Sequence, residues 1–100
     1  MSKHFNGLTP AEAERLALLS EELGEAQQAI GKILRHGYNS SNPYDSSTNT
    51  NRNYLERELG DVQFAIKLMT DKKDLNYGNV ELARNKKGVA VWQYLHHNKA

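Results

Sequence analysis

Hydrophobic residues in the first third of the chain recur at helical spacing. Thr9, Pro10 and Glu12 have the features of a helix start, because a hydroxyl can cap the first turn, proline suits the first helical position and an early acid complements the positive helix end. Gly37 is a typical stop signal. The pattern therefore predicts a long helix between Pro10 and Gly37, with an apolar row formed by Leu16, Leu19, Leu23, Ile30 and Leu34.

A long polar segment follows this helix. The fourteen residues from 37 to 50 are mostly Asn, Ser, Thr, Tyr, Pro and Gly, and they show no periodicity. A connection longer than about 12 residues is unusual in a compact domain and is commonly either functional or disordered. We expect a loop over residues 37–50.

Two further helices are expected after the loop. Asn53 stands three residues before Glu56, as in a capping box, and predicts the start of a second helix that ends near Asp71. A short polar connection, KKDLNYGN, leads to a third helix, in which Gly88 is unfavourable. The apolar faces comprise Leu55, Leu59, Val62, Ile66 and Met69 in the second helix, and Val80, Ala83, Val91, Tyr94 and Leu95 in the third. No alternating strand pattern competes, so the predicted fold is all-α, a single domain over residues 1–100.

Length and composition narrow the possible partners. A chain of one hundred residues buries only about 60 to 70% of its unfolded surface, so its core is thin and we expect a second subunit to complete the helical bundle. The absence of cysteine excludes thiolate chemistry and fits a reducing cytoplasm. No run approaches the roughly 18 apolar residues of a membrane span. Thirteen basic and twelve acidic residues leave a net charge of +1, which is too balanced for a nucleic-acid partner.

Two pairs of acidic residues interrupt apolar rows. The first row has spacings of 4, 3, 4 and 4 and the second has spacings of 4, 3, 4 and 3, so the members of each row share one side of a helix. The first row is Leu18, Glu22, Glu25, Ala29 and Ile33, and the second is Tyr54, Glu58, Asp61, Ala65 and Leu68. Within each pair the Cβ atoms are about 5 to 6 Å apart, so the carboxylates repel each other.

Such pairs indicate a metal site. Partly buried carboxylates of like charge must take up protons or bind a cation, and all-oxygen ligation is the preference of hard ions such as Mg²⁺ or Mn²⁺. A single E-x-x-E motif is usually a solvated helix face, but two pairs within apolar rows make a site and a solvated face about equally good explanations. A di-iron carboxylate bundle would need Glu-x-x-His pairs, and none occurs here.

The segment ELGE at Glu22–Glu25, followed by ELGD at Glu58–Asp61, resembles the E-x-x-E and E-x-x-D signature of the MazG-like all-α nucleotide pyrophosphohydrolases. The resemblance runs from about Leu8 to Leu95 and is closest to the short single-domain versions found in phages and bacteria. It implies hydrolysis of a nucleoside triphosphate, often a deoxynucleotide, to the monophosphate and pyrophosphate, with Mg²⁺ or Mn²⁺ held by these four acids. It also implies a homodimer or a dimer of dimers, with the site at a subunit interface.

Other residues are candidates for substrate contacts or support. Lys87 shares a face of the third helix with apolar residues and could bind phosphate, although its stem could instead pack while its ammonium reaches solvent. Arg35 and His36 end the first helix beside the loop, where they could touch phosphate or base, but the helix dipole equally explains a cation there. Lys86 and Asn85 are weaker candidates for substrate binding. Glu21 lies nearer the polar side of its helix and fits a supporting role behind the metal ligands.

The function expected from the sequence is thus metal-dependent hydrolysis of a (d)NTP to (d)NMP and pyrophosphate in the cytoplasm. Two alternatives remain open. A phosphoribosyl-ATP pyrophosphohydrolase would share the metal site but not the base pocket. A non-catalytic helical module would use the acids to bind a metal or a basic partner.

Overall fold

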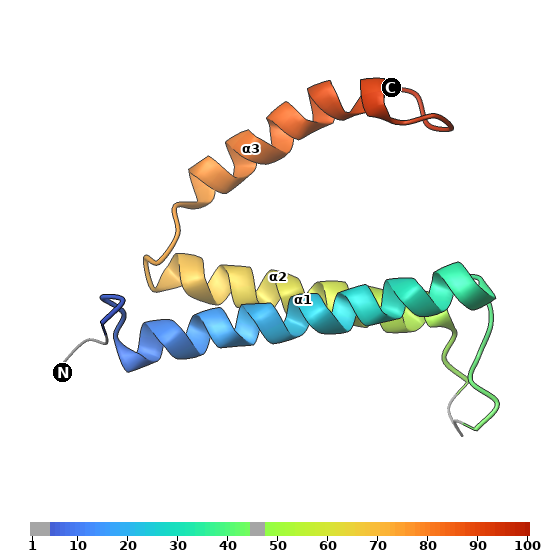
Figure 1. Ribbon diagram of the computed structural model, residues 1–100, viewed down its shortest axis with the longest axis horizontal. Coiled ribbons are helices and arrows are strands. Elements are labelled where there is room, and N and C mark those ends of the chain that lie inside the picture. Colours follow the sequence, from blue (N-terminus) through green and yellow to red (C-terminus); the bar gives the residue numbers. More distant parts are fainter. Residues whose placement is uncertain (1–4, 45–47) are drawn as a thin grey trace.

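The protein is all-α in a computed structural model that describes residues 5–44 and 48–100. The elements are α1 (Pro10–His36), α2 (Asn51–Asp71), α3 (Tyr77–Ala90) and a short 3₁₀ helix, η1 (Val91–Tyr94), and the described residues contain no strand. α1 and α2 form an antiparallel hairpin, and α3 leaves the hairpin at the end of α2 (Figure 1). The predicted all-α class with three main helices is confirmed.

α1 begins and ends where the sequence predicts. The Glu12 backbone N–H donates to Thr9 Oγ1 at 3.1 Å, and the Thr9 N–H donates to Glu12 Oε1 at 2.8 Å, which completes a capping box. At the other end Gly37 has a φ of 86°, which glycine adopts without a steric penalty, and its N–H donates to the Ile33 carbonyl.

α2 begins earlier than predicted. Thr50, not Asn53, is the N-cap, and Asn53 occupies the third helical position of the same box. The Asn53 N–H donates to Thr50 Oγ1 at 3.2 Å, while the Thr50 N–H donates to Asn53 Oδ1 at 3.0 Å. Asn53 Nδ2 also bonds Glu56 Oε1, so the pairing noted in the sequence exists one turn inside the helix. The predicted end of this helix at Asp71 is confirmed.

Small side chains line the contact between α1 and α2. Ala26, Ala29 and Ala65 are buried, with Ala65 fully inaccessible, and Met69 is 2% exposed. Alanine at such positions lets two helices approach closely, because no longer side chain holds their backbones apart. The side of α1 that packs on α2 is therefore the row that carries Ala29 and the acidic pair, not the row of leucines.

The loop between α1 and α2 is anchored at its root. The Asn51 N–H donates to the Ser40 carbonyl at 2.9 Å, and the Arg52 N–H donates to the Tyr38 carbonyl at 3.0 Å. The Asn51 side chain, itself buried, donates to the Gly37 carbonyl at 3.2 Å. The described parts of the predicted loop, residues 37–44 and 48–50, contain no helix or strand, and residues 45–47 lie outside the described residues.

α3 differs from the prediction in position and length. It is capped by Asn76 and spans Gly88, but it ends at Ala90 and continues only as η1, instead of remaining α-helical to Leu95. None of its residues is buried. The connection that leads to α3 is held to the hairpin by Arg15 of α1, which forms a bidentate ion pair with Asp74 at 2.6 and 2.9 Å, and by the Asp74 N–H, which donates to the Met69 carbonyl at 2.9 Å.

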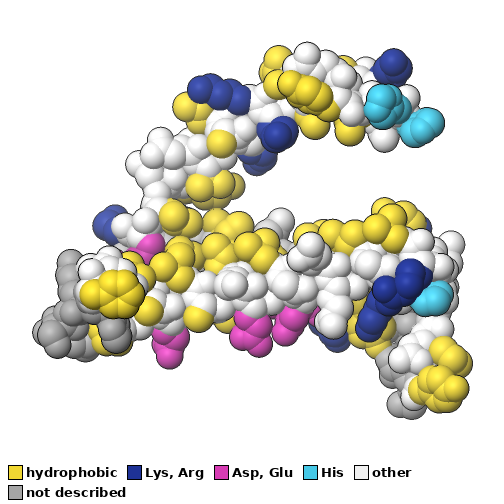
Figure 2. All heavy atoms as spheres, in the orientation of Figure 1, with side chains coloured by type: hydrophobic (Ala, Val, Ile, Leu, Met, Phe, Trp, Pro, Cys, Tyr) yellow, Lys and Arg dark blue, Asp and Glu magenta, His cyan; other side chains and the backbone are white. Residues whose placement is uncertain are grey.

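An apolar surface of the hairpin remains uncovered. Leu16, Leu23 and Ile30 of α1 are 44 to 51% exposed, and Leu34 is 81% exposed. Figure 2 shows hydrophobic side chains gathered along the edge of the hairpin that faces α3, with acidic side chains along the opposite edge. Among the described residues, no helix is both long enough and apolar enough to cross a bilayer.

Candidate metal centre

Four carboxylates converge between α1 and α2. Glu22 and Glu25 come from α1, and Glu58 and Asp61 come from α2. Each residue offers one carboxylate oxygen, and these four oxygens all lie within 4.8 Å of one another. The four acids singled out from the sequence are thus neighbours in space, because both acidic pairs lie on the faces that the buried alanines bring together. We call these four residues the acidic cluster.

Two acids of the acidic cluster have an oxygen without a partner. Glu22 and Glu58 are half-buried, and the Oε2 atom of each is inaccessible and makes no hydrogen bond. A buried carboxylate oxygen that lacks a donor loses its hydration without compensation. A proton or a bound cation would supply the missing interaction.

The acids also repel one another. Loss of hydration raises the pKa of Glu22, and the negative charges of Asp61, Glu21 and Glu58 raise it further. The pKa of Glu25 is raised by its hydrogen-bond interaction with Glu58 and by the charge of Glu22. Glu21 is exposed and its negative charge adds to both pKa shifts, while its supporting role behind the metal ligands stays a prediction.

The oxygen spacing fits a divalent cation after a small adjustment. Two oxygens on opposite sides of one Mg²⁺ are roughly 4.2 Å apart, since each metal–oxygen bond is about 2.1 Å. The four oxygens of the acidic cluster are up to 4.8 Å apart, so small side-chain rotations that move each oxygen by a few tenths of an ångström would bring them to the metal-binding distance. An all-carboxylate donor set suits hard ions such as Mg²⁺, Mn²⁺ or Ca²⁺. The residues present therefore fit a divalent metal, and their role as ligands stays a prediction.

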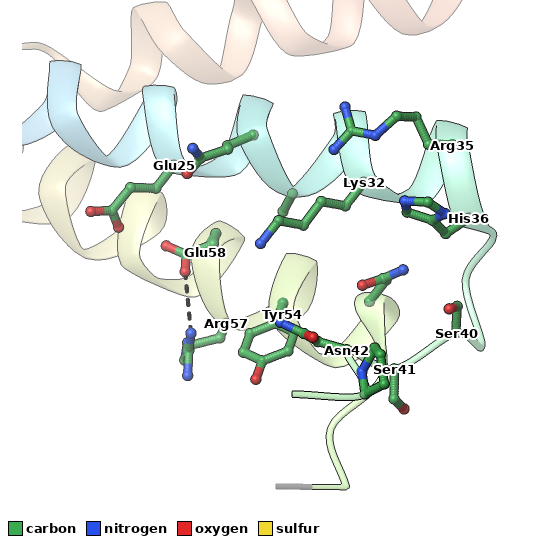
Figure 3. Close-up of a pocket in the computed structure, with 14 residues that line it drawn as sticks. Glu25, Lys32, Arg35, His36, Ser40, Ser41, Asn42, Tyr54, Arg57 and Glu58 are labelled. Atoms are coloured by element: carbon green, nitrogen blue, oxygen red, sulfur yellow. Dashed lines mark ion pairs between the residues drawn. The ribbon is translucent and has the colours of Figure 1, made fainter. Parts of the chain in front are cut away.

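A cavity of about 710 Å³ adjoins the acidic cluster. This volume lies within the roughly 300–1,000 Å³ of small-molecule sites. Two of the acids, Glu25 and Glu58, form one end of the cavity, and loop residues 40–43 form the other, as Figure 3 shows. Between them the walls carry Gln28, Ala29, Lys32, Arg35, His36, Asn51, Tyr54 and Arg57. We call this space the hairpin cavity.

The candidate substrate residues fall into two groups. Arg35 and His36 line the hairpin cavity, on the loop side of the acidic cluster. Asn85, Lys86 and Lys87 are exposed on α3 and do not line it. The sequence places Lys87 on the apolar face of α3, and no residue of α3 is buried in a single chain. Contact of Lys87 with substrate therefore stays a prediction without support from this geometry.

Sequence reasoning missed two cations of the hairpin cavity. Lys32 follows Glu25 by seven residues, which is two helical turns on the same face, and Arg57 directly precedes Glu58. Spacing could have singled out Lys32. Exposed cations on helices are so common, however, that only the cavity distinguishes these two from solvated side chains.

No protein-family model, curated protein or solved structure matches the chain. The functional interpretation consequently depends on the residues and their arrangement.

Proposed function

We propose that this protein is a metal-dependent nucleoside triphosphate pyrophosphohydrolase of the MazG-like type, which converts a (d)NTP and water to (d)NMP and pyrophosphate. The observation that supports it is the convergence of four carboxylates from two helices beside a cation-lined cavity. This arrangement supports metal-assisted hydrolysis, whereas the choice of a nucleotide and the release of pyrophosphate come from the sequence resemblance.

The residues of the acidic cluster would hold the metal. A divalent cation, when bound, polarises phosphate oxygens and lowers the pKa of water at the site. Without positive charge the four carboxylates would repel a polyphosphate, so the acidic cluster admits a substrate only when that charge is neutralised. Glu22 and Glu58, which are half-buried, would fix the position of the ion, and the more exposed Asp61 faces solvent, from which water enters.

Product analysis tests this proposal. The protein is incubated with Mg²⁺ or Mn²⁺ and each member of a panel of ribonucleoside and deoxyribonucleoside triphosphates, and the products are separated by chromatography. Monophosphate with pyrophosphate is expected, and Glu58→Gln should abolish it. Diphosphate with orthophosphate would contradict the pyrophosphohydrolase assignment.

The two alternatives are distinguished in the same assay. Phosphoribosyl-ATP is included in the panel, and exclusive turnover of that compound would favour the related pyrophosphohydrolase. A protein that binds metal but hydrolyses no member of the panel would favour a non-catalytic module.

We also propose that a second copy of the chain covers the apolar edge of the hairpin. The accessible surface is 8093 Å², whereas a compact monomer of 11.3 kDa exposes roughly 5,700 Å². The radius of gyration is 17.4 Å, against roughly 13 Å for a compact domain of this length. Leu16, Leu23 and Ile30 repeat every seven residues and so form a continuous seam suited to another helix. A homodimer or dimer of dimers would bury this seam.

A further inference from the structure

Positive side chains gather directly beside the acidic cluster. Lys32 is seven residues after Glu25, so its Cα lies roughly 10 Å further along α1, and Arg35 lies one turn beyond it. Figure 3 shows the Lys32 side chain reaching from α1 across the hairpin cavity toward α2. The hairpin cavity therefore has a negative end and a positive middle.

These cations lack strong protein partners. Among residues 5–44 and 48–100, neither Lys32 nor Arg35 makes an ion pair. Arg57 lies over the Tyr54 ring at 4.9 Å, and its Nη2 is 3.6 Å from Glu58 Oε1, which is longer than a hydrogen bond. Its side chain is 60% exposed, so its donors remain accessible to a ligand.

Opposite charges side by side limit which ligand can fill the whole cavity. The acidic cluster accepts a cation, whereas Lys32, Arg35 and Arg57 accept anionic oxygens, and arginine suits phosphate because its guanidinium can donate two parallel hydrogen bonds. A metal-complexed polyphosphate carries both charges. The Cα atoms of Lys32 and Arg35 lie two and three turns along α1 from Glu25, and a chain of several phosphates matches this spacing better than a single phosphate group.

We propose that Lys32, supported by Arg35 and Arg57, binds the phosphate groups that extend beyond the acidic cluster, so that the hairpin cavity selects triphosphates over diphosphates and monophosphates. That the ligand is a nucleotide rests on the proposed function. The cations themselves call only for a metal-complexed polyphosphate chain.

The direct test uses inorganic triphosphate at a fixed concentration of free Mg²⁺. Calorimetry compares the unmodified protein with Lys32→Gln, Arg35→Gln and a matched control, Lys72→Gln, which alters an exposed lysine outside the hairpin cavity. Lys32→Gln should weaken binding at least tenfold, Arg35→Gln should weaken it less, and Lys72→Gln should leave it unchanged. Equal affinity of the Lys32→Gln and unmodified proteins, or no binding by the unmodified protein, would overturn the inference. Melting curves show whether each variant is folded.

A kinetic comparison separates this inference from the proposed function. If the protein hydrolyses a nucleoside triphosphate, Lys32→Gln should raise KM at least tenfold with a smaller change in kcat. Normal KM in that variant would refute the role of Lys32 and leave the hydrolase assignment intact. Lys32-dependent binding of inorganic triphosphate by a protein that hydrolyses no nucleotide would refute the hydrolase assignment and support the polyphosphate site.

Discussion

Glu22 and Glu58 each keep one buried oxygen without a hydrogen-bond donor. In the metal-free protein, Glu22→Gln and Glu58→Gln remove one repelling charge each, so we expect an unchanged or higher melting temperature. With Mn²⁺ the unmodified protein should melt at a higher temperature than either variant, because a metal present at a hundredfold excess over its Kd stabilises the unmodified protein by about 2.7 kcal/mol. Thermal melts with EDTA and with Mn²⁺ measure both effects.

Glu21→Gln is the matched control, since Glu21 is exposed beside the acidic cluster. It should reduce the Mn²⁺-induced shift only slightly. A Glu22→Gln protein that still gains full stability from Mn²⁺ would count against a four-carboxylate site.

The shifted pKa values of the acidic cluster and of Asp74 should change the stability of the protein in opposite directions as pH falls. The pKa values of Glu22 and Glu25 are raised above the ordinary 4.5, so the folded state binds their protons more tightly than the unfolded state does. The resulting stabilisation is complete below pH 4.5 and is lost as pH rises through the raised values. Asp74 has a pKa lowered from 3.8, so its contribution is present above that value and is lost as pH falls through the lowered one.

Without metal, the stability of the protein should therefore rise as pH falls from neutrality to mild acidity, and it should fall again in strong acid. The shift induced by Mn²⁺ should shrink over the same mildly acidic range, since protons compete with the metal. Melting temperatures recorded against pH, with and without Mn²⁺, check this. Parallel curves would indicate that the metal binds elsewhere.

Between the elements, the ion pair of Arg15 with Asp74 is the best-formed polar contact of the α2–α3 connection. Its side chains are 16% and 12% exposed, and two hydrogen bonds join them. Asp74→Asn should lower the melting temperature by several degrees, because Arg15 loses its carboxylate partner. Asp71→Asn is the control, since its ion pair with Lys67 is well exposed and should contribute little. Equal effects of the two substitutions would contradict a special role for Asp74.

The N-cap of α2 gives a second prediction at this scale. Thr50→Ala removes the hydroxyl that accepts from Asn53 N–H, and loss of such a cap costs about 1 kcal/mol. Urea unfolding should report this loss, whereas Thr48→Ala, in the exposed loop, should change the free energy of unfolding little. The same destabilisation in both variants would mean that the cap contributes nothing specific.

The helices and the two acidic pairs could be predicted from sequence because both depend on residues a few positions apart, whereas the joining of the two pairs was expected from the resemblance to a known family. The N-cap of α2 lies three residues before the predicted one, because Thr50 and Asn53 each precede a residue that can complete a capping box, and the choice between them depends on backbone geometry at the loop root. The path of α3 could not be predicted, because it depends on contacts between residues far apart in the sequence, such as the ion pair of Arg15 with Asp74, fifty-nine positions apart. Lys32 and Arg57 gain their significance only from the walls around them.

For the whole molecule, the uncovered apolar edge predicts association. Leu23→Glu places a charge in the seam of Leu16, Leu23 and Ile30 and should convert the expected oligomer to monomer at micromolar concentration. Light scattering measures the change. Ala17→Glu introduces the same charge on another exposed side of α1 and should leave the oligomer intact. An unmodified protein that is a stable monomer would refute the proposed second copy.

The seam and the hairpin cavity lie on opposite sides of α1. Leu23 and Glu25 are two positions apart, as are Ile30 and Lys32, and two residues turn a helix by roughly 200°. A partner seated on the seam would leave the hairpin cavity open to solvent, so a dimer formed through the seam would not place the site at the subunit interface that the sequence resemblance implies. Substrate entry and assembly should therefore not compete for the same surface.

The alanines between the two helices have a consequence for the protein's tolerance to mutation. Ala29 and Ala65 each stand four residues after an acid of the acidic cluster and have no polar group of their own. A larger side chain at either position would wedge the backbones apart, and an ångström of widening would carry the carboxylates beyond the reach of one ion. In a library of all single substitutions selected for activity, these two chemically inert positions should be as intolerant as the acids, while glycine or serine survives there.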